Sequence, residues 1–514
     1  MPMDLPELQY PARLNCAVEL LDRSIEQHGP DRPCFVAGDG TAWTYAEVRA
    51  RANAVAQVLT RDLGLVPGGR VLLRGPNNPW LAVCWLAVLK AGGVVVTTMP
   101  LLRSGELQVV CDMGKVGIAL CDARFLDDLV AADIPGLSVT SYGGEDAGDL
   151  LTLMQDKPAS YDDVDTAADD VALLAFTSGT TGKPKATMHV HRDVLAIADT
   201  FSAHVVKPVP TDVFAGSPPL AFTFGLGGLV VFPMRAGASS LLLEKAPPEE
   251  LFAAVGRHRV SVLFTAPTGY RAALRHVDEY DLSSLRRCVS AGEALPRATW
   301  DAFHEATGLR IIDGIGATEM LHVFISAADD DIRPGSTGRE VPGYRACVLD
   351  DTGRPVSDGQ PGRLAVKGPT GCRYLADDRQ AVYVQHGWNI TGDTYIRDAD
   401  GYFWFQARSD DMIISAGYNI AGPEVENALL RHPAVAECAV VGLPDEDRGM
   451  VVTAYVLLAP DVPATAATVA ALQDFVKAEI APYKYPRVIH FVDALPKTAT
   501  GKLQRFALRQ QTSA

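Results

Sequence analysis

The chain has 514 residues, of which 48% are hydrophobic and 21% charged, and 62 acidic against 46 basic side chains give a formal net charge of −16. This length exceeds one ordinary hydrophobic core, so two or more domains are expected, and the composition excludes a disordered chain. The acidic balance argues against a nucleic-acid-binding surface, although it allows a local basic pocket for a nucleotide.

The cysteines and the N-terminal residues bear on the cellular compartment. The 9 cysteines are scattered without a Cys-x-x-Cys pair, which favours a reducing compartment and thiols packed in the core. The segment MPMDLPELQYPAR lacks the basic and apolar runs of a signal peptide. The longest apolar block, residues 80–89, is about half a membrane span. We expect a cytoplasmic protein without a membrane partner.

From about residue 70, short apolar runs alternate with helical patterns. The runs RVLLRG, GVVVTTM and VGIALCD are typical of strands, and NPWLAVCWLAVLKAG and SGELQVVCDMGK between them are typical of helices. The same alternation returns from ASSLLLE through PPEELFAAVGRHR and VSVLFTAP to LRRCVSAG. Strands that alternate with helices predict parallel sheets in an α/β fold.

The pattern changes after about residue 335. YRACVLDDTGRPVSDGQPGRLAVKG reads as short strands separated by turns, which predicts a small antiparallel β region. Beyond residues 407–420, a helix, two strands and a helix follow in GPEVENALLRHPAV, AECAVVGLPD, VVTAYVLLAP and VAALQDFVKAEI. We expect an N-terminal α/β domain with the antiparallel region, residues 1–409, and a small α+β C-terminal domain, residues 410–514.

The nonapeptide TSGTTGKPK, Thr177 to Lys185, is dense in hydroxyl, glycine and lysine residues, which can surround an anion with donors. It is not the common phosphate loop G-x-x-x-x-G-K-[ST], because Thr177 stands where that motif has glycine and Pro184 follows Lys183. Proline has no N–H to donate to a phosphate. The segment is therefore either a different phosphate-binding loop or a surface turn.

Several motifs in order carry a resemblance to a known family. TSGTTGKPK, SAGEALP, GIGATEM, TGDT, ARSDDMIISAGYNI and PKTATGK resemble those of the adenylate-forming superfamily, which contains acyl- and aryl-CoA ligases, firefly luciferase and peptide-synthetase adenylation domains. The resemblance covers essentially the whole chain. Within the superfamily, GIGATEMLHVFIS and PLAFTFGLGG are most similar to benzoate and 2-aminobenzoate CoA ligases. The resemblance to the superfamily implies a mobile C-terminal domain.

The resemblance implies a site for ATP and Mg²⁺. The Thr177–Lys185 loop would hold the β- and γ-phosphates and stabilise the leaving pyrophosphate; Ala186 departs from the usual glycine just after it. Thr318 would contact a phosphate, and Glu319 would bind Mg²⁺, which needs few protein carboxylates when phosphates hold it. Asp393 would accept from both ribose hydroxyls. The implied nucleotide-binding residues are Thr177, Ser178, Gly179, Thr180, Thr181, Gly182, Lys183, Lys185, Gly292, Glu293, Asp313, Gly314, Gly316, Thr318, Asp393 and Arg408.

Among these, Asp313, Gly314 and Gly316 correspond to the strip on which adenine lies, where glycine allows close approach. The implied catalytic residues are Lys502, Thr318 and Glu319, with Lys502 bridging the carboxylate and the α-phosphate. Asp410 matches the hinge of the C-terminal domain, and Gly417 matches the glycine beside the pantetheine channel. Taken singly, such residues are more often surface charges, caps or turn residues.

The acid pocket is implied at Phe222, Phe224, Gly316, His322 and Val323. Aromatic faces would stack on a flat ring, and His322 could hydrogen-bond an ortho substituent or the carboxylate; the alternative for the phenylalanines is a plain core role. The pair His189 and His191 could suggest a metal, but no third ligand lies near in sequence, so we favour a structural role.

Three functions compete. The first is an AMP-forming aryl-acid CoA ligase that uses ATP, Mg²⁺, CoA and an aryl carboxylate, with a homodimer as a candidate assembly. The second is an adenylating enzyme that loads a carrier protein; Thr223, where amino-acid-activating relatives have Asp, argues against an α-amino acid. The third is a binding protein on a degenerate scaffold, which the intact Lys502, Glu319 and Asp393 oppose. The sequence does not name the acid.

Overall fold

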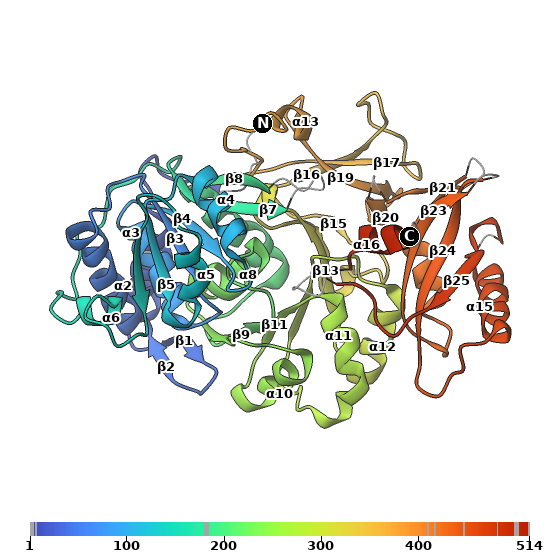
Figure 1. Cartoon of the computed structure of the whole chain (residues 1–514), viewed down its shortest axis with the longest axis horizontal. Helices are drawn as coiled ribbons and strands as arrows, with labels where there is room; N and C mark the ends of the chain where they lie inside the picture. Colours follow the sequence, from blue (N-terminus) through green and yellow to red (C-terminus); the bar gives the residue numbers. More distant parts are fainter. Residues whose placement is uncertain are drawn as a thin grey trace.

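The computed structural model describes residue 5 and residues 8–178, 184–408, 411–415, 418–445, 448–480, 482–497 and 503–511. Two large sheets with helices on their faces form the main body, an antiparallel sheet lies at the top of Figure 1, and a separate α+β unit lies at its right. This arrangement confirms the predicted fold class.

The first large sheet is six-stranded. Its strands, in spatial order, are β6 (Ser138–Tyr142), β5 (Ile118–Asp122), β3 (Arg70–Arg74), β4 (Val94–Thr98), β7 (Val171–Ser178) and β8 (Pro184–Val190). All pairs are parallel except β7 with β8, which is antiparallel. The predicted parallel sheet is confirmed, with one reversed strand at its edge.

The strands of this sheet are buried on both faces. Leu72 of β3 packs with α4 (Ser104–Gly114) and α5 (Leu126–Ala131), whereas its neighbours Val71 and Leu73 pack toward α3 (Pro79–Lys90). Successive side chains of a strand point to opposite faces, so a strand covered on both sides reads as a continuous apolar run. That is why RVLLRG shows no polar alternation.

The second large sheet is nine-stranded. In spatial order it contains β15 (Arg339–Glu340), β14 (Val323–Ser326), β13 (Ile311–Gly316), β12 (Arg287–Ser290), β11 (Val262–Thr265), β9 (Val213–Gly216), β10 (Ser239–Leu242), β1 (Pro33–Ala37) and β2 (Ala42–Thr44). The strands from β13 to β1 are parallel, and β14, β15 and β2 are antiparallel additions.

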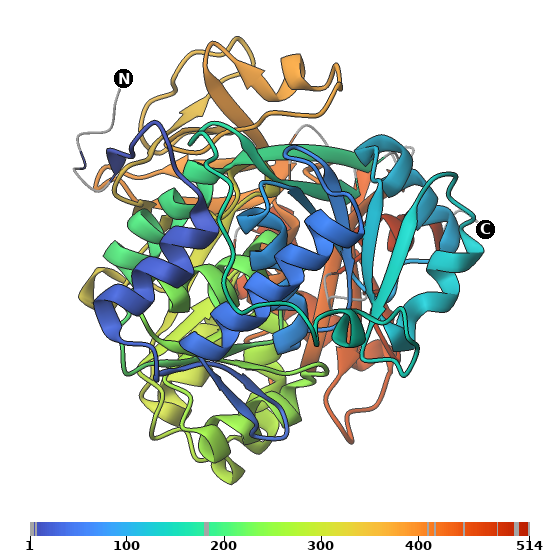
Figure 2. The ribbon, with the colours of Figure 1, turned by 90° about the vertical axis from the view of Figure 1, so that its left-hand side faces the viewer.

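Helices complete a layered body. Those between the two sheets include α1 (Cys16–His28), α2 (Tyr45–Gln57) and α3, and the outer face of the second sheet is covered by α10 (Pro248–His258), α11 (Pro267–Ala273) and α12 (Arg297–Thr307). In Figure 2 the cyan segments that include α4 and α5 lie to the right of the blue helices, and the yellow-green helices of the second sheet lie below them. The short helices are α6 (Leu150–Leu153), α7 (His191–Ile197), α8 (Thr223–Leu226), α9 (Phe232–Arg235) and α13 (Gln380–Tyr383).

The predicted antiparallel region is confirmed. It contains β16 (Arg345–Leu349), β17 (Pro361–Lys367), β19 (Trp388–Arg397), β18 (Val384–Gln385) and β20 (Phe403–Arg408). Every pair in it is antiparallel.

The C-terminal unit has its own core. Its sheet contains β22 (Tyr418–Ile420), β21 (Ile413–Ser415), β24 (Gly449–Leu458), β23 (Val435–Asp445) and β25 (Val488–Phe491), and its helices are α14 (Gly422–Leu429), α15 (Ala466–Glu479) and α16 (Arg505–Gln511). One face of the sheet packs on α14 and α15, and the other packs on Leu508 of α16. The boundary between residues 409 and 410 falls outside the described residues and stays a prediction.

No helix within the described ranges is both long and apolar enough to cross a membrane.

Candidate active site

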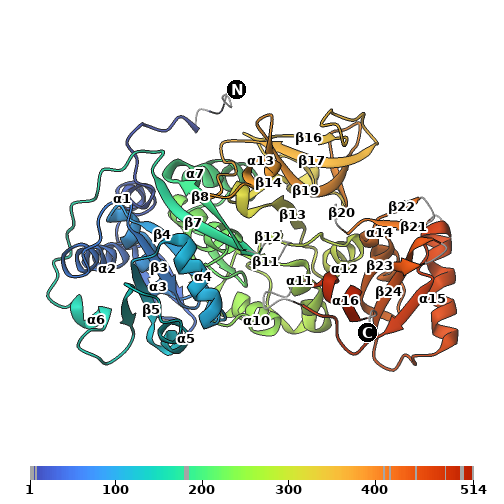
Figure 3. The same ribbon diagram turned by 45° about the horizontal axis from the view of Figure 1, so that its top comes forward.

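Three of the predicted site segments follow β9, β12 and β13, parallel strands of the nine-stranded sheet, in which β11 separates β9 from β12. Phe222 and Phe224 follow β9, Gly292 and Glu293 follow β12, and β13 ends at Gly316 just before Thr318. The carboxyl ends of parallel strands share one edge of a sheet, and ligands of α/β folds bind at that edge. Figure 3 shows β11, β12 and β13 between the two halves of the molecule.

The two ends of the TSGTTGKPK segment lie on paired antiparallel strands. Thr177 on β7 pairs with Lys185 on β8, and Ser178 pairs with Pro184. Gly179, Thr180, Thr181, Gly182 and Lys183 lie outside the described residues. The described ends of the segment therefore lie on two antiparallel strands, whereas the common phosphate loop leads from a strand into a helix.

Lys185 and Glu319 lie together, as the nucleotide-site prediction requires. The Lys185 Nζ is 3.2 Å from the Glu319 Oε1 and donates to the Tyr374 hydroxyl at 2.7 Å. The Tyr374 hydroxyl in turn donates to the Glu319 Oε1 at 2.5 Å. Burial, together with the charge of Glu319, holds the pKa of Tyr374 well above its ordinary value, so the phenol stays protonated. Nothing in the sequence around Tyr374 indicated this role.

Thr318 is anchored by a buried histidine. The His189 Nε2 lies 2.7 Å from the Thr318 carbonyl oxygen, and its Nδ1 lies 3.9 Å from the Asp193 Oδ2. Asp193 also accepts from Arg373 at 2.8 Å. These contacts join β8, α7 and the Thr318 turn, and they agree with the structural role favoured for His189. His191 accepts from the Cys16 amide at 3.1 Å, and burial lowers its pKa to about 4.

Asp393 and Arg408 face each other across two strands. They are directly opposite in the β19–β20 ladder, and the Arg408 Nη1 lies 3.4 Å from the Asp393 Oδ1. The Asp393 side chain is 11% exposed and that of Arg408 40%. A mostly buried carboxylate with an accessible guanidinium beside it matches the predicted pair of nucleotide contacts.

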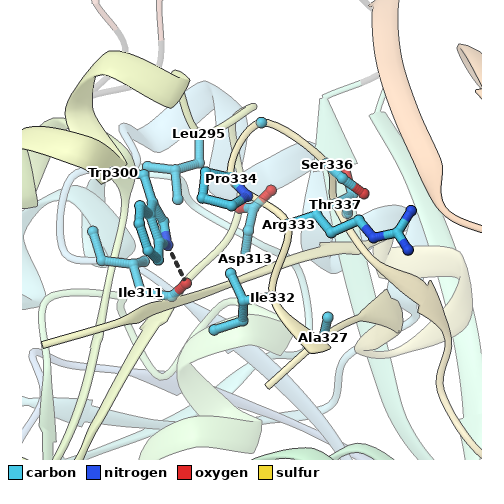
Figure 4. A pocket seen from close by; sticks show the side chains of 11 residues that line it. Leu295, Trp300, Ile311, Asp313, Ala327, Ile332, Arg333, Pro334, Ser336 and Thr337 are labelled. Carbon is cyan, nitrogen blue, oxygen red and sulfur yellow. Dashed lines mark hydrogen bonds between the residues drawn. The ribbon is translucent and has the colours of Figure 1, made fainter. Parts of the chain in front are cut away.

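Asp313 points into a small pocket beside the predicted adenine strip. The pocket is lined by Leu295, Trp300, Ile332, Ser336 and Thr337, and the Trp300 indole donates to the Ile311 carbonyl at 2.9 Å (Figure 4). Within the described chain, the buried Asp313 Oδ1 has no hydrogen-bond partner. Burial raises the pKa of Asp313 to about 8. Because buried polar groups are usually hydrogen-bonded, this carboxyl group could bind a polar group of a ligand.

Gly314 and Gly316 have a packing reason as well. A Cβ at Gly314 would lie 2.7 Å from the Val323 Cγ1, and one at Gly316 would lie 2.7 Å from the His322 carbonyl oxygen. Both glycines therefore allow β13 to approach the segment that turns back into β14. Gly292 has a φ of +90° and no atom within 4 Å of its notional Cβ.

His322 lies in a cage of aromatic rings. Its ring centroid is 4.6 Å from that of Phe232, 5.3 Å from Phe201 and 5.6 Å from Phe224. Among the described residues neither ring nitrogen has a hydrogen-bond partner of ordinary geometry, although the Phe224 backbone lies close enough to favour the charged form of the ring. Burial lowers the pKa of His322 to about 3, so the imidazole is neutral at physiological pH. Sequence reasoning identified Phe224 and His322 and missed Phe201 and Phe232.

The remaining pocket predictions lie around this cage. Val323 is buried beside Gly314, and Phe222 is half-buried at the start of α8. Phe264 of β11 lies 5.4 Å from Phe224, ring to ring. Phe264 was part of a predicted strand, and no local signal distinguished it from a core residue.

The C-terminal unit reaches this site. The Leu503 amide donates to the Glu293 Oε1 at 3.1 Å. Arg271 of α11 lies 3.3 Å from Glu437 of β23, which also pairs with Lys497 at 2.7 Å. Lys502, Asp410 and Gly417 lie outside the described residues, but the neighbour of Lys502 contacts the predicted nucleotide motif.

The described residues offer few side chains that could bind a metal ion. Across the described ranges, no group of three or more His, Cys, Asp or Glu side chains could hold a metal ion. Both hydrogen-bonding neighbours of Glu319 use its Oε1. A single carboxylate with a second oxygen to offer fits a Mg²⁺ ion held mainly by phosphates.

Comparison with known proteins agrees with this geometry. A model of the family described as AMP-binding enzyme matches residues 21–374, and the AMP-binding enzyme C-terminal domain matches residues 424–502. Benzoate–CoA ligase of Thauera aromatica is 34% identical over 98% of this chain and 97% of its own. The 3-hydroxybenzoate–CoA ligase of Aromatoleum sp. is 31% identical over 97% of both. The crystal structure of the anthranilate CoA ligase AuaEII in complex with anthranoyl-AMP superposes with a TM-score of 0.94, at 34% identity, over 99% of both chains.

Proposed function

The chain belongs to the family of AMP-binding enzymes, and from that premise we propose that it is an aryl-acid CoA ligase of the benzoate or 2-aminobenzoate type. As an AMP-forming acid–thiol ligase, it converts a carboxylate and ATP to an acyl-adenylate and pyrophosphate. The CoA thiol then displaces AMP to give the thioester.

The observation that carries the aryl assignment is the His322 cage. Its neighbours Phe201, Phe224 and Phe232 present rings at 4.6 to 5.6 Å, and edge or offset contacts of that kind suit a flat ring. The neutral imidazole carries one N–H donor and one acceptor nitrogen, and neither makes a hydrogen bond of ordinary geometry within the described chain. An amino group ortho to the carboxylate would supply a complementary partner, which favours 2-aminobenzoate.

Each group of predicted site residues would have a separate role in adenylation. Asp393 and Arg408 would hold the nucleotide, and the hairpin ending at Lys185 would surround the phosphates. Glu319 would hold a Mg²⁺ ion, which offsets phosphate charge when it is bound. Lys502, beside the Leu503 amide that contacts Glu293, would approach the α-phosphate and the carboxylate. Its ammonium would stabilise the charge that develops when the two anions meet.

A cytoplasmic location and a homodimer belong to this proposal as predictions. The free cysteines, nearly all buried, support a reducing compartment.

The test is a substrate panel without any carrier protein. Benzoate, 2-aminobenzoate, 3-hydroxybenzoate, hexanoate and octanoate would each be incubated with ATP, Mg²⁺ and CoA, and thioesters would be measured by mass spectrometry. We expect kcat/KM for the best benzoate-type acid to exceed that for the linear acids by at least about tenfold, the scale of a misfit in an apolar pocket. Equal or faster turnover of octanoate would rule out the aryl assignment. Adenylate that accumulates in the presence of CoA would rule out CoA as the acceptor.

A further inference from the structure

We propose that Tyr374 is a positioning residue for the metal-binding carboxylate: its hydroxyl holds one oxygen of Glu319 and thereby presents the other oxygen to the metal ion of metal–ATP. The proposal rests on the proposed function only in that metal–ATP is a substrate. It does not depend on which acid or which thiol the enzyme uses.

Two groups, the Tyr374 hydroxyl and the Lys185 ammonium, converge on a single oxygen of the Glu319 carboxylate. The Tyr374 hydroxyl donates to the Glu319 Oε1 at 2.5 Å and accepts from the Lys185 Nζ at 2.7 Å, while the same Nζ lies 3.2 Å from that Oε1. The Lys185 ammonium also lies 4.7 Å from the centre of the Tyr374 ring. Within the described chain, the Glu319 Oε2 accepts no hydrogen bond, so the contacts leave one oxygen of the carboxylate for another ligand.

The backbone holds Tyr374 independently of Glu319. The Tyr374 amide donates to the Gln380 side chain at 2.7 Å, and Gln380 donates back to the Cys372 carbonyl at 3.0 Å. The Met188 amide donates to the Arg373 carbonyl at 2.7 Å, and the Leu375 amide donates to the Ala186 carbonyl at 2.9 Å. Residues 373–375 therefore lie as a short added strand along β8, which also carries Lys185.

The surroundings of the phenol add rigidity. Tyr374 is 5% exposed and its ring packs edge-on against Tyr383, with centroids 5.8 Å apart. A buried tyrosine has two side-chain torsions and a fixed ring, so it holds its hydroxyl at little further entropic cost. The hydroxyl is thus in place before any nucleotide binds.

The two partners of Glu319 differ in whether a bound nucleotide competes for them. Lys185 belongs to the predicted phosphate-binding hairpin, so a phosphate competes with Glu319 for its ammonium. Tyr374 has no such competitor, and its hydrogen bond keeps the carboxylate oriented after the ammonium turns away. Partners that orient a metal ligand commonly contribute about 10- to 100-fold in affinity or activity. The effect is expected to be strong here, because a phosphate-bound Mg²⁺ takes only one or two protein carboxylates.

The experiment measures nucleotide binding to the full chain, without acid or CoA. The probe is α,β-methylene-ATP, whose α–β linkage cannot be cleaved, and its affinity is measured once with saturating Mn²⁺ and once with EDTA. Tyr374→Phe keeps the ring and removes only the hydroxyl. We expect it to weaken binding of the Mn²⁺–nucleotide by about tenfold or more and to leave binding of the metal-free nucleotide unchanged within about twofold.

Tyr383→Phe is the matched control. It removes a buried hydroxyl from the neighbouring ring, and within the described residues that hydroxyl has no hydrogen-bond partner. Both affinities should equal those of the wild-type protein. Thermal unfolding of the two variants checks that the loop around Tyr374 is retained.

A double mutant tests whether Tyr374 acts through Glu319. In a Glu319→Gln background the carboxylate to be positioned is absent, so adding Tyr374→Phe should cause no further loss of Mn²⁺–nucleotide affinity. The proposal is overturned if Tyr374→Phe weakens both forms of the nucleotide equally, if it weakens neither, or if its full effect persists beside Glu319→Gln. A failure of the acid panel would leave these binding results untouched, so the two proposals fail separately.

Discussion

His322 shows how burial sets the chemistry of a single residue. Its imidazole is enclosed by Phe201, Phe224 and Phe232, and burial lowers its pKa to about 3. A positive charge there would have no solvent and no carboxylate to offset it. The imidazole therefore stays neutral near pH 7, where it offers one donor and one acceptor, and it lowers the stability of the fold only in acid.

The pH dependence of stability tests this view of His322. Its folded pKa of about 3 lies below the ordinary value of about 6.5, so between these values the unfolded chain binds a proton that the folded chain does not. Stability contributed by the neutral side chain is therefore lost as pH falls below about 6.5. His322→Leu should lower this acid sensitivity by up to about 2 kcal/mol between pH 8 and pH 5.

Denaturant unfolding of both proteins at the two pH values provides the measurement. His191, whose pKa burial also lowers, to about 4, is common to both proteins and cancels in the difference. An equal loss of stability on acidification in both proteins would show that His322 is protonated in the folded state.

At the scale of elements, the helical segment after β9 shapes the predicted acid pocket. Thr223–Leu226 forms α8, and the chain continues as a wider helix over Gly227–Val231. A Cβ at Gly227 would lie 2.4 Å from the His322 Cδ2, and one at Gly228 would lie 2.6 Å from the Phe264 ring. The two glycines let the helix backbone approach the rings closely.

Gly227→Ala should therefore disturb the pocket more than the nucleotide site. We expect kcat/KM for the preferred acid to fall by at least about tenfold, because the imidazole must move, and the fold to lose about 1–3 kcal/mol through overpacking. The KM for ATP should stay within about twofold of the wild-type value. Steady-state kinetics with each substrate varied in turn would show this.

Gly105→Ala is the control for helix effects in general, because nothing lies within 4 Å of its notional Cβ on α4. It should leave kcat/KM unchanged and be neutral or slightly stabilising. If Gly227→Ala changed kcat/KM for the acid and KM for ATP by the same factor, the assignment of this segment to the acid pocket would be contradicted.

At the scale of the molecule, contacts between the two units define one arrangement of them. The Leu503 amide contacts Glu293, and Arg271 pairs with Glu437. This arrangement brings the chain beside Lys502 to the nucleotide motif of the large part. Thioester formation would need another arrangement if the C-terminal domain rotates about Asp410 as the family resemblance implies.

Separate assays of the two half-reactions test the assignment of Lys502. Lys502→Ala should lose on the order of 10²- to 10³-fold in acyl-adenylate formation, the scale of removing one preorganised transition-state donor. It should convert chemically supplied acyl-adenylate and CoA to thioester at near the wild-type rate. The measurement is rapid-quench or coupled kinetics of each half-reaction alone.

Lys497→Ala serves as the control, since it removes a lysine of the same segment that pairs with Glu437. Both half-reactions of that variant should stay within a few-fold of wild type, because Glu437 keeps Arg271 as a partner. If Lys502→Ala impairs both half-reactions equally, Lys502 has a structural role or the domains do not alternate.

The sequence by itself determined the fold class and named most of the residues that are predicted to form the nucleotide site. Periodicity is a property of neighbouring residues, so runs such as RVLLRG and the helical patterns between them predicted β3, α3, β4, α4 and β5. Short motifs likewise hold their chemistry within a few residues, which is why Lys185, Glu319, Asp393 and Arg408 could be named in advance and lie together in pairs.

Only the tertiary structure decided which distant residues meet. Tyr374 reaches Glu319 across 55 positions and Lys185 across 189, and Phe201 and Phe232 meet His322 from other helical segments. A lone tyrosine or phenylalanine has the same local signature in a core, on a surface or beside a catalytic group. Its role depends on the order of strands in the sheets and on the loops at their ends, and those are properties of the packed chain.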